Sequence, residues 1–168
     1  MLIPYQGRYP QIDGNVFIAE GAKLIGDVRI GNESSIWFNA VLRGDLAEIV
    51  IGNRTNLQDG VIGHVNASQP LVVGDNVSVG HAAVIHGCRI GTGTLIGMGA
   101  IVLNGADIGE YALVGAGSLV TENTTIPPYT LSLGSPAKVV RELNEEDLER
   151  MRRTTESYVV KGKEYSIP

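Results

Sequence analysis

Residues 90–126 read IGTGTLIGMGAIVLNGADIGEYALVGAGSLVTENTTI and place a large aliphatic side chain at every sixth position. The same period of six begins at Ile12 and, with interruptions, governs roughly 115 residues. A small residue follows four positions after most of the aliphatic residues, and Gly, Asn or Asp commonly lies between them. The chain holds 22 glycines in 168 residues, which suits a turn every few residues.

A unit of six residues suits a short strand followed by a tight turn, and three units close a triangular coil. The aliphatic side chain points into the prism, while Gly or Asn tolerates the positive φ of the turn. One coil cannot bury its apolar face alone, so stability requires stacking. A doubly wound α/β fold needs helical periods between strands, and residues 12–126 contain none. The repeat therefore predicts an all-β solenoid, a parallel β-helix.

The end of the chain departs from this repeat. Pro127 and Pro128 break the frame, and a helical pattern begins at Asn144, a suitable N-cap followed by three acidic residues. Its apolar stripe comprises Leu148, Met151, Tyr158 and Val159. We predict a helix over residues 144–162, and a division into a β-helix domain, 1–140, and a C-terminal helix and tail packed on the prism, 141–168.

Composition limits the partners of the chain. It is 43% hydrophobic with a formal net charge of −5, which predicts a soluble globular protein and argues against nucleic acid or an anionic membrane as partner. No apolar run reaches the roughly 18 residues of a membrane span, and no signal segment begins the chain, so we expect a cytoplasmic location. The single cysteine, Cys88, cannot form an intrachain disulfide.

The three histidines of the chain, His64, His81 and His86, all lie in its middle. His64 and His86 each come one residue after a repeat start on the third face of consecutive coils. They should therefore be stacked neighbours, one strand spacing apart. Arg43 has the same place one coil earlier, so Arg43, His64 and His86 should form a ladder.

His81 belongs to the second face and does not readily reach the other two histidines around a corner of its own chain. In a homotrimer of prisms, His81 of one chain could meet His64 and His86 of the next. Three imidazoles with an open fourth position are the ligand set of a catalytic zinc site. Asp59 shares the coil phase of His81 and could orient its ring.

Nearby polar residues complete this pattern. Gln58 and Asp45 lie close to the same corner, and Arg43 could pair with Asp59 or Asp45 of a neighbouring chain. The motifs Arg43-Gly44-Asp45, Gln58-Asp59, Gly63-His64, Gly80-His81 and Ile85-His86-Gly87 together resemble the signature of the γ-class carbonic anhydrases and their bacterial relatives. The resemblance covers nearly the whole chain, including residues 134–138 and the C-terminal helix.

This resemblance implies a homotrimer of left-handed β-helices with metal sites at the subunit interfaces. The metal is Zn²⁺, or Fe²⁺ or Co²⁺, and the family ligands match His64, His81 and His86. Gln58 and Asp45 match residues that hold the metal-bound water and bicarbonate. Arg43 matches a residue of the interface, paired with Asp59, and Tyr158 corresponds to a helix residue that reaches the site in some relatives.

The implied reaction is the reversible hydration of carbon dioxide, a small-molecule substrate. The chain departs from the best-known family member where a proton must be carried to solvent. Leu46 replaces a glutamate after Arg-Gly-Asp, and residues 65–69 replace an acidic loop. Two alternatives stay open: a catalytically weak metal-binding scaffold, and a hexapeptide-repeat acyltransferase. The transferase needs only one histidine as general base, so it leaves the stacked pair without a use.

Overall fold

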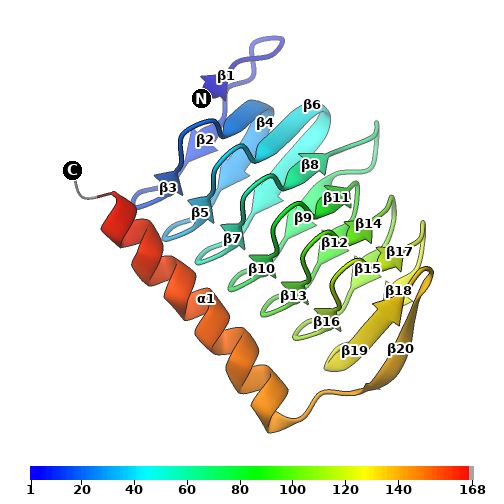
Figure 1. Cartoon of the computed structure of the whole chain (residues 1–168). Helices are drawn as coiled ribbons and strands as arrows, with labels where there is room; N and C mark the ends of the chain where they lie inside the picture. The colour runs from blue at the N-terminus through cyan, green and yellow to red at the C-terminus, as the bar shows by residue number, and fades with distance from the viewer. Residues whose placement is uncertain (167–168) are drawn as a thin grey trace.

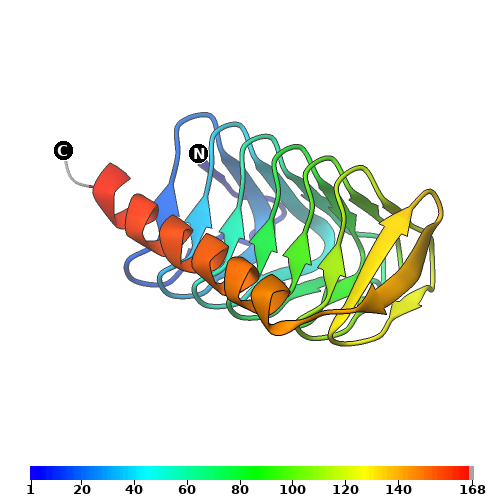
Figure 2. The ribbon, with the colours of Figure 1, turned by 60° about the horizontal axis from the view of Figure 1, so that its bottom comes forward.

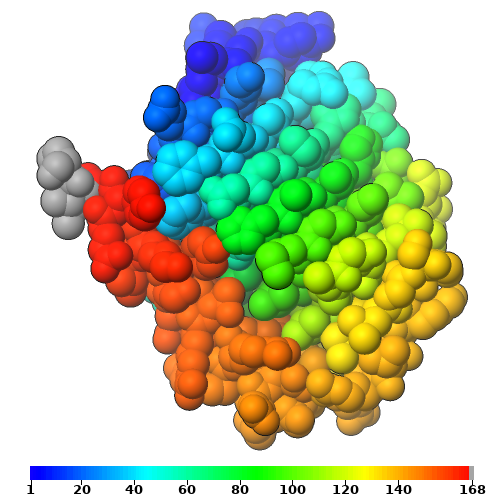
Figure 3. All heavy atoms as spheres, viewed as in Figure 1, coloured from blue at the N-terminus to red at the C-terminus, as the bar shows by residue number. Residues whose placement is uncertain are grey.

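The computed structural model describes residues 1–166 and is a left-handed parallel β-helix with one C-terminal helix. Successive coils stack along one axis, and helix α1 (Glu145–Tyr165) runs along the side of the stack (Figures 1 and 2). In the space-filling view of Figure 3 the coils follow one another in chain order, with α1 at their margin. The predicted β-helix is confirmed.

Short strands form the faces of the prism and pair in parallel with the equivalent strands of the coils before and after them. Two long strands, β4 and β6, bend round an edge and join two faces in one twelve-stranded sheet; the other sheet has eight strands. Among the strands within residues 1–166, only β19 and β20 pair antiparallel. The strands are β1 (Leu2–Ile3), β2 (Gln11–Ile12), β3 (Phe17–Ile18), β4 (Lys23–Ile30), β5 (Ser35–Ile36), β6 (Val41–Ile51), β7 (Asn56–Leu57), β8 (Ile62–His64), β9 (Leu71–Val73), β10 (Ser78–Val79), β11 (Val84–His86), β12 (Arg89–Ile90), β13 (Leu95–Ile96), β14 (Ile101–Val102), β15 (Asp107–Ile108), β16 (Leu113–Val114), β17 (Leu119–Val120), β18 (Thr125–Ile126), β19 (Thr130–Gly134) and β20 (Ala137–Glu142).

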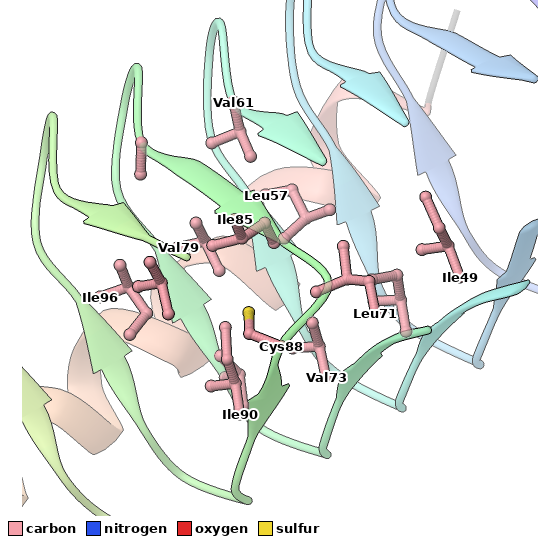
Figure 4. Close-up of a cluster of buried hydrophobic side chains, with 14 of the residues drawn as sticks. Ile49, Leu57, Val61, Leu71, Val73, Val79, Ile85, Cys88, Ile90 and Ile96 are labelled. Carbon is pink, nitrogen blue, oxygen red and sulfur yellow. The ribbon is translucent and has the colours of Figure 1, made fainter. Parts of the chain in front are cut away.

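The core fills the inside of the prism with the aliphatic residues of the repeat (Figure 4). Leu57, Ile85 and Ile96 are among the side chains with no exposed surface. Gly63 takes an inward repeat start because a Cβ there would lie 2.5 Å from a methyl group of Leu42. Cys88 belongs to the same core, and burial raises the pKa of its thiol to about 12. The thiol is therefore a packing group rather than a nucleophile.

One corner of the prism tests the expectation that Gly or Asn occupies the turns. Asn15 and Asn76 do take positive φ there, but Arg54, Tyr111 and Tyr129 adopt it as well. The rings of Tyr111 and Tyr129 stack with centroids 5.2 Å apart. Contact between successive coils therefore compensates for the strain of a left-handed backbone, which costs roughly 1–2 kcal/mol for a residue with a Cβ.

Helix α1 begins where the sequence predicts and ends three residues later than expected, at Tyr165. Asn144 caps it and forms a capping box with Asp147. The face toward the prism is buried and contains Asp147, Met151, Thr155, Val159 and Gly162, while Leu148 and Tyr158 are half-buried. The ring of Tyr165 packs on Phe17 and Trp37, which extends the helix. Within residues 1–166 no helix is long and apolar enough to cross a membrane.

The capping box predicts a pH dependence of stability. Hydrogen bonds from the Arg141 guanidinium and the Asn144 backbone hold the pKa of Asp147 at about 2, below its ordinary value of 3.8. A lowered pKa favours folding fully above pH 4, and this contribution is lost as the pH falls toward 2. We expect Asp147→Asn to lower the urea midpoint at pH 7 and the difference from wild type to shrink below pH 4. A difference that stays constant with pH would contradict this assignment.

Candidate metal centre

The ladder predicted on the third face is present. Residues Arg43 of β6, His64 of β8 and His86 of β11 lie opposite one another in adjacent strands. The two imidazoles meet edge to face, and His64 Nδ1 lies 3.0 Å from His86 Nε2. The period of the repeat, interrupted by the loop after His64, is therefore what brings two residues 22 positions apart into contact.

Hydrogen bonds at the far side of each ring determine which nitrogens carry lone pairs. His64 Nε2 lies 2.9 Å from Asp45 Oδ1, and His86 Nδ1 lies 2.6 Å from Asn104 Oδ1. Both oxygens only accept, so each of these nitrogens carries the one proton of its ring when the imidazole is neutral. The two facing nitrogens, His64 Nδ1 and His86 Nε2, then both present lone pairs. Two facing lone pairs repel each other, and a metal ion between them would relieve this repulsion.

The donor set therefore fits a metal ion. Two imidazole nitrogens on a tetrahedral zinc, each about 2.0–2.1 Å from the metal, lie about 3.3 Å apart. The 3.0 Å between His64 Nδ1 and His86 Nε2 is close to that separation. Among residues 1–166 of a single chain, however, no three His, Cys, Asp or Glu side chains gather into a metal-binding group. The pair needs a further ligand from elsewhere.

His81 occupies the turn between β10 and β11 and does not join the other two histidines within one chain. Its Nδ1 lies 2.7 Å from Asp59 Oδ2, and its backbone N–H donates to Gln58 Oε1 at 3.2 Å. Asp59 is itself placed by the backbone N–H of Phe38, at 3.2 Å. Asp59 thus contacts the ring that the sequence predicts it to orient, and it does so through Nδ1, which leaves Nε2 available to other groups. The side chain of His81 is 43% exposed, as a ligand offered to a second chain would be.

Arg43 and Asp45 pair within the chain. The sequence allowed Arg43 a partner in Asp45 or Asp59 of a neighbour; within one chain Arg43 contacts its own Asp45, and the contact with a neighbouring chain stays a prediction. Burial opposes ionisation of Asp45, but the hydrogen bonds from His64 and Arg43 outweigh it and lower the pKa of this carboxyl. Asp45 is therefore an anion at neutral pH, directly behind His64.

Tyr158 reaches the corner of His81 from helix α1. Its hydroxyl lies 3.4 Å from His81 Nε2, and its ring packs against Trp37 with centroids 5.2 Å apart. Burial and the charge of Asp59 raise the pKa of Tyr158, so the phenol is neutral at pH 7. A cavity of about 360 Å³ opens beside it, lined by Gln58 and His81 and by apolar groups that include Leu95, Ile96, Met98, Leu113 and Val114.

Two residues of this arrangement were missed by the sequence analysis. Asn104 contacts His86 directly, and Glu122 accepts a hydrogen bond from the Asn104 amide at 3.1 Å. The signal was available in the repeat, because Asn104 and Glu122 take the coil position of Gly87, the residue after His86, in the next two coils. A polar side chain at that coil position predicts a hydrogen-bond partner for the histidine of the neighbouring coil.

The fold and the stacked histidines define a hexapeptide-repeat protein with a candidate metal centre. A family model described as bacterial transferase hexapeptide (six repeats) matches residues 87–122. A carbonic anhydrase of Geobacillus kaustophilus is 52% identical over 165 residues, covering 98% of this chain and 91% of that protein. Gamma carbonic anhydrase 2, mitochondrial, of Arabidopsis thaliana is 44% identical over 158 residues, covering 90% of this chain and 57% of that protein.

A solved structure from Bacillus cereus, provisionally described as an acetyltransferase, superimposes with a TM-score of 0.97. It is 49% identical and the match covers 98% of this chain and 96% of that one. With two carbonic anhydrases matched over most of its length, the chain belongs to the γ-carbonic anhydrase family of hexapeptide-repeat proteins.

Proposed function

We propose that the protein catalyses the reversible hydration of carbon dioxide at metal sites shared between the chains of a homotrimer. The observation that carries the proposal is the 3.0 Å approach of His64 Nδ1 to His86 Nε2, the two nitrogens whose lone pairs we infer to face each other. The third ligand in this proposal is His81 of a neighbouring chain, with its ring set by Asp59. The similarity to proteins named carbonic anhydrase supports the reaction. The cytoplasmic location stays a prediction from the sequence.

The metal in this proposal is Zn²⁺, with Fe²⁺ or Co²⁺ as substitutes, because three neutral imidazoles suit all three ions. Such an ion supplies a nucleophile at neutral pH by lowering the pKa of water toward about 7. The chain contributes the orientation of the rings: Asp45 holds His64, Asn104 holds His86 and Asp59 holds His81. Oriented ligands lose less freedom when the metal binds.

Carbon dioxide is small and apolar, and the apolar cavity beside His81 suits it. In this proposal Gln58, which lines the cavity, orients the reactants. Its amide is fixed, because Oε1 accepts from the His81 N–H and Nε2 donates to Asn56 Oδ1 at 3.1 Å. Asp45, fixed between His64 and Arg43, is the proposed acceptor for a hydrogen bond from water or bicarbonate.

The proton released in each turnover has no evident carrier among residues 1–166. Asp45 has a lowered pKa and Tyr158 a raised one, so neither exchanges protons readily near pH 7. Leu46 is exposed where the best-known relative has a glutamate, and residues 66–69 form a tight turn without an acid. We therefore expect turnover to rise with the concentration of buffer base.

The trimer is supported by an apolar column beside the histidine ladder. Side chains that point outward from the third face pair in register along the stack, and they are Val41, Ile62, Val84, Ile101 and Leu119. Ile62 and Ile101 are each 39% exposed in one chain. A contiguous apolar column of this kind is typical of a surface that a partner covers.

The test is stopped-flow hydration of carbon dioxide with protein loaded with zinc and, separately, with ferrous iron under anaerobic conditions. Zinc or iron per chain is measured on the same samples, with His81→Ala as control. We expect hydration above buffer in wild type, rising with imidazole buffer, and background rates in His81→Ala. Stoichiometric metal without hydration would favour the metal-binding scaffold. Absence of metal together with release of coenzyme A thiol from acetyl-coenzyme A would favour the acyltransferase.

A further inference from the structure

We propose that Asn104 and Glu122 are positioning residues for His86, which hold its ring as the Nδ1–H tautomer and so direct the lone pair of Nε2 toward His64. This inference rests on the proposed function only for the role that the tautomer plays in metal binding. The tautomer itself is a property of the metal-free chain and can be measured there. The contacts that carry it are the 2.6 Å from His86 Nδ1 to Asn104 Oδ1 and the 3.1 Å from Asn104 Nδ2 to Glu122 Oε1.

The donor and acceptor of each of these hydrogen bonds follow from Glu122, the residue farthest from His86. The carboxylate of Glu122 only accepts, so the Asn104 amide must turn its NH₂ group toward Glu122. The carbonyl oxygen of Asn104 then faces His86 and also only accepts. His86 must therefore donate from Nδ1, which leaves Nε2 of the neutral ring unprotonated. Glu122 thus determines the tautomer of His86 without touching it.

The backbone of the repeat leaves room for this arrangement. Gly87, Asn104 and Glu122 occupy the same coil position in three successive coils. Gly87 has φ of +51°, and a Cβ on it would lie 2.7 Å from Asn104 Oδ1. A side chain at position 87 would therefore push the acceptor away from His86. The glycine after His86 is explained by the space that Asn104 needs as well as by the turn.

The choice of an amide has a chemical consequence. His64 and His81 each have a carboxylate behind the ring, from Asp45 and Asp59. Asn104 accepts a hydrogen bond from His86 but adds no charge and takes up no proton, while the charge of Glu122 lies one residue further out. Asn104 and Glu122 therefore orient the His86 ring without placing a proton acceptor directly behind it.

The first test is ¹⁵N NMR of histidine-labelled, metal-free protein at alkaline pH, where three histidines give a simple spectrum. We expect His86 to have a protonated Nδ1 and an unprotonated Nε2 in wild type. In Asn104→Ala the ring should shift to a mixture that includes the Nε2–H form. Asn123→Ala, at the next residue along the chain from Glu122, is the matched control and should leave His86 unchanged. A wild-type His86 protonated at Nε2 would overturn the proposal.

The second test is zinc affinity by competition with a chelator. Loss of such a supporting contact typically weakens metal binding by about 10–100-fold, which we expect for Asn104→Ala. Glu122→Ala should weaken binding in the wild-type background but not in Asn104→Asp, because aspartate accepts from His86 through either oxygen and needs no orienting partner. Equal losses from Glu122→Ala in both backgrounds would indicate a merely structural role and overturn the proposal.

These outcomes are separable from failure of the proposed function. A wild-type protein that binds zinc but hydrates no carbon dioxide would reject the reaction and leave both tests valid. A wild-type protein that binds no zinc would reject the metal site, and the tautomer measurement would still decide the role of Asn104. Circular dichroism and the melting temperature of each variant confirm that the β-helix is intact.

Discussion

Co-expressed His81→Ala and His64→Ala chains are expected to recover activity that neither variant has alone. If each site takes His64 and His86 from one chain and His81 from the next, a His81→Ala chain still supplies the first two ligands. A His64→Ala chain still supplies the third. A cyclic trimer that contains both variants then has one correctly ordered interface, so about one third of its sites should be complete.

The experiment requires trimers of mixed composition. The two variants carry different affinity tags, and sequential purification selects assemblies that contain both. Zinc retained after dialysis and carbon dioxide hydration are then measured per chain. The matched control is a mixture of His64→Ala and His86→Ala, in which no interface has both ligands of the stacked pair. Recovery in the control, or none in the test mixture, would contradict a site shared between chains.

The sequence predicted the ladder correctly because the repeat converts sequence position directly into spatial position. Arg43, His64 and His86 share one phase, and parallel strands of consecutive coils keep equivalent residues opposite each other. The same reasoning placed His81 on a different face beside Asp59. No long-range packing had to be guessed for these residues, since a solenoid makes contacts only between neighbouring coils.

The features that the sequence did not predict depend on side-chain contacts between coils. Tyr111 and Tyr129 take a backbone conformation that favours Gly or Asn, and their stacking explains why they are tolerated. Helix α1 continues past residue 162 because Tyr165 packs on Phe17 and Trp37. The choice of Asp45 as the intrachain partner of Arg43 likewise depends on rotamers, which the repeat does not fix.

The stability of the β-helix should depend strongly on its inward aliphatic residues, and Leu57→Ala tests this. Leu57 has no exposed surface and lies between Ile36 and Val79 in the adjacent coils. Removal of a buried leucine side chain leaves a cavity that rigid neighbouring coils fill poorly, so we expect a loss of about 2–5 kcal/mol in the free energy of unfolding. Urea denaturation at a fixed protein concentration measures it.

Leu2→Ala makes the same chemical change at a side chain that is 49% exposed, on strand β1 at the end of the stack. The loss should be at most about 0.5 kcal/mol, because surface substitutions remove few contacts. Equal losses for the two variants would mean that the coils relax around a missing side chain. Leu57 directly precedes Gln58 and Asp59, so a rigid core at this position also holds these two residues of the candidate metal centre in place. We therefore expect Leu57→Ala to weaken zinc binding together with stability, and Leu2→Ala to leave both unchanged.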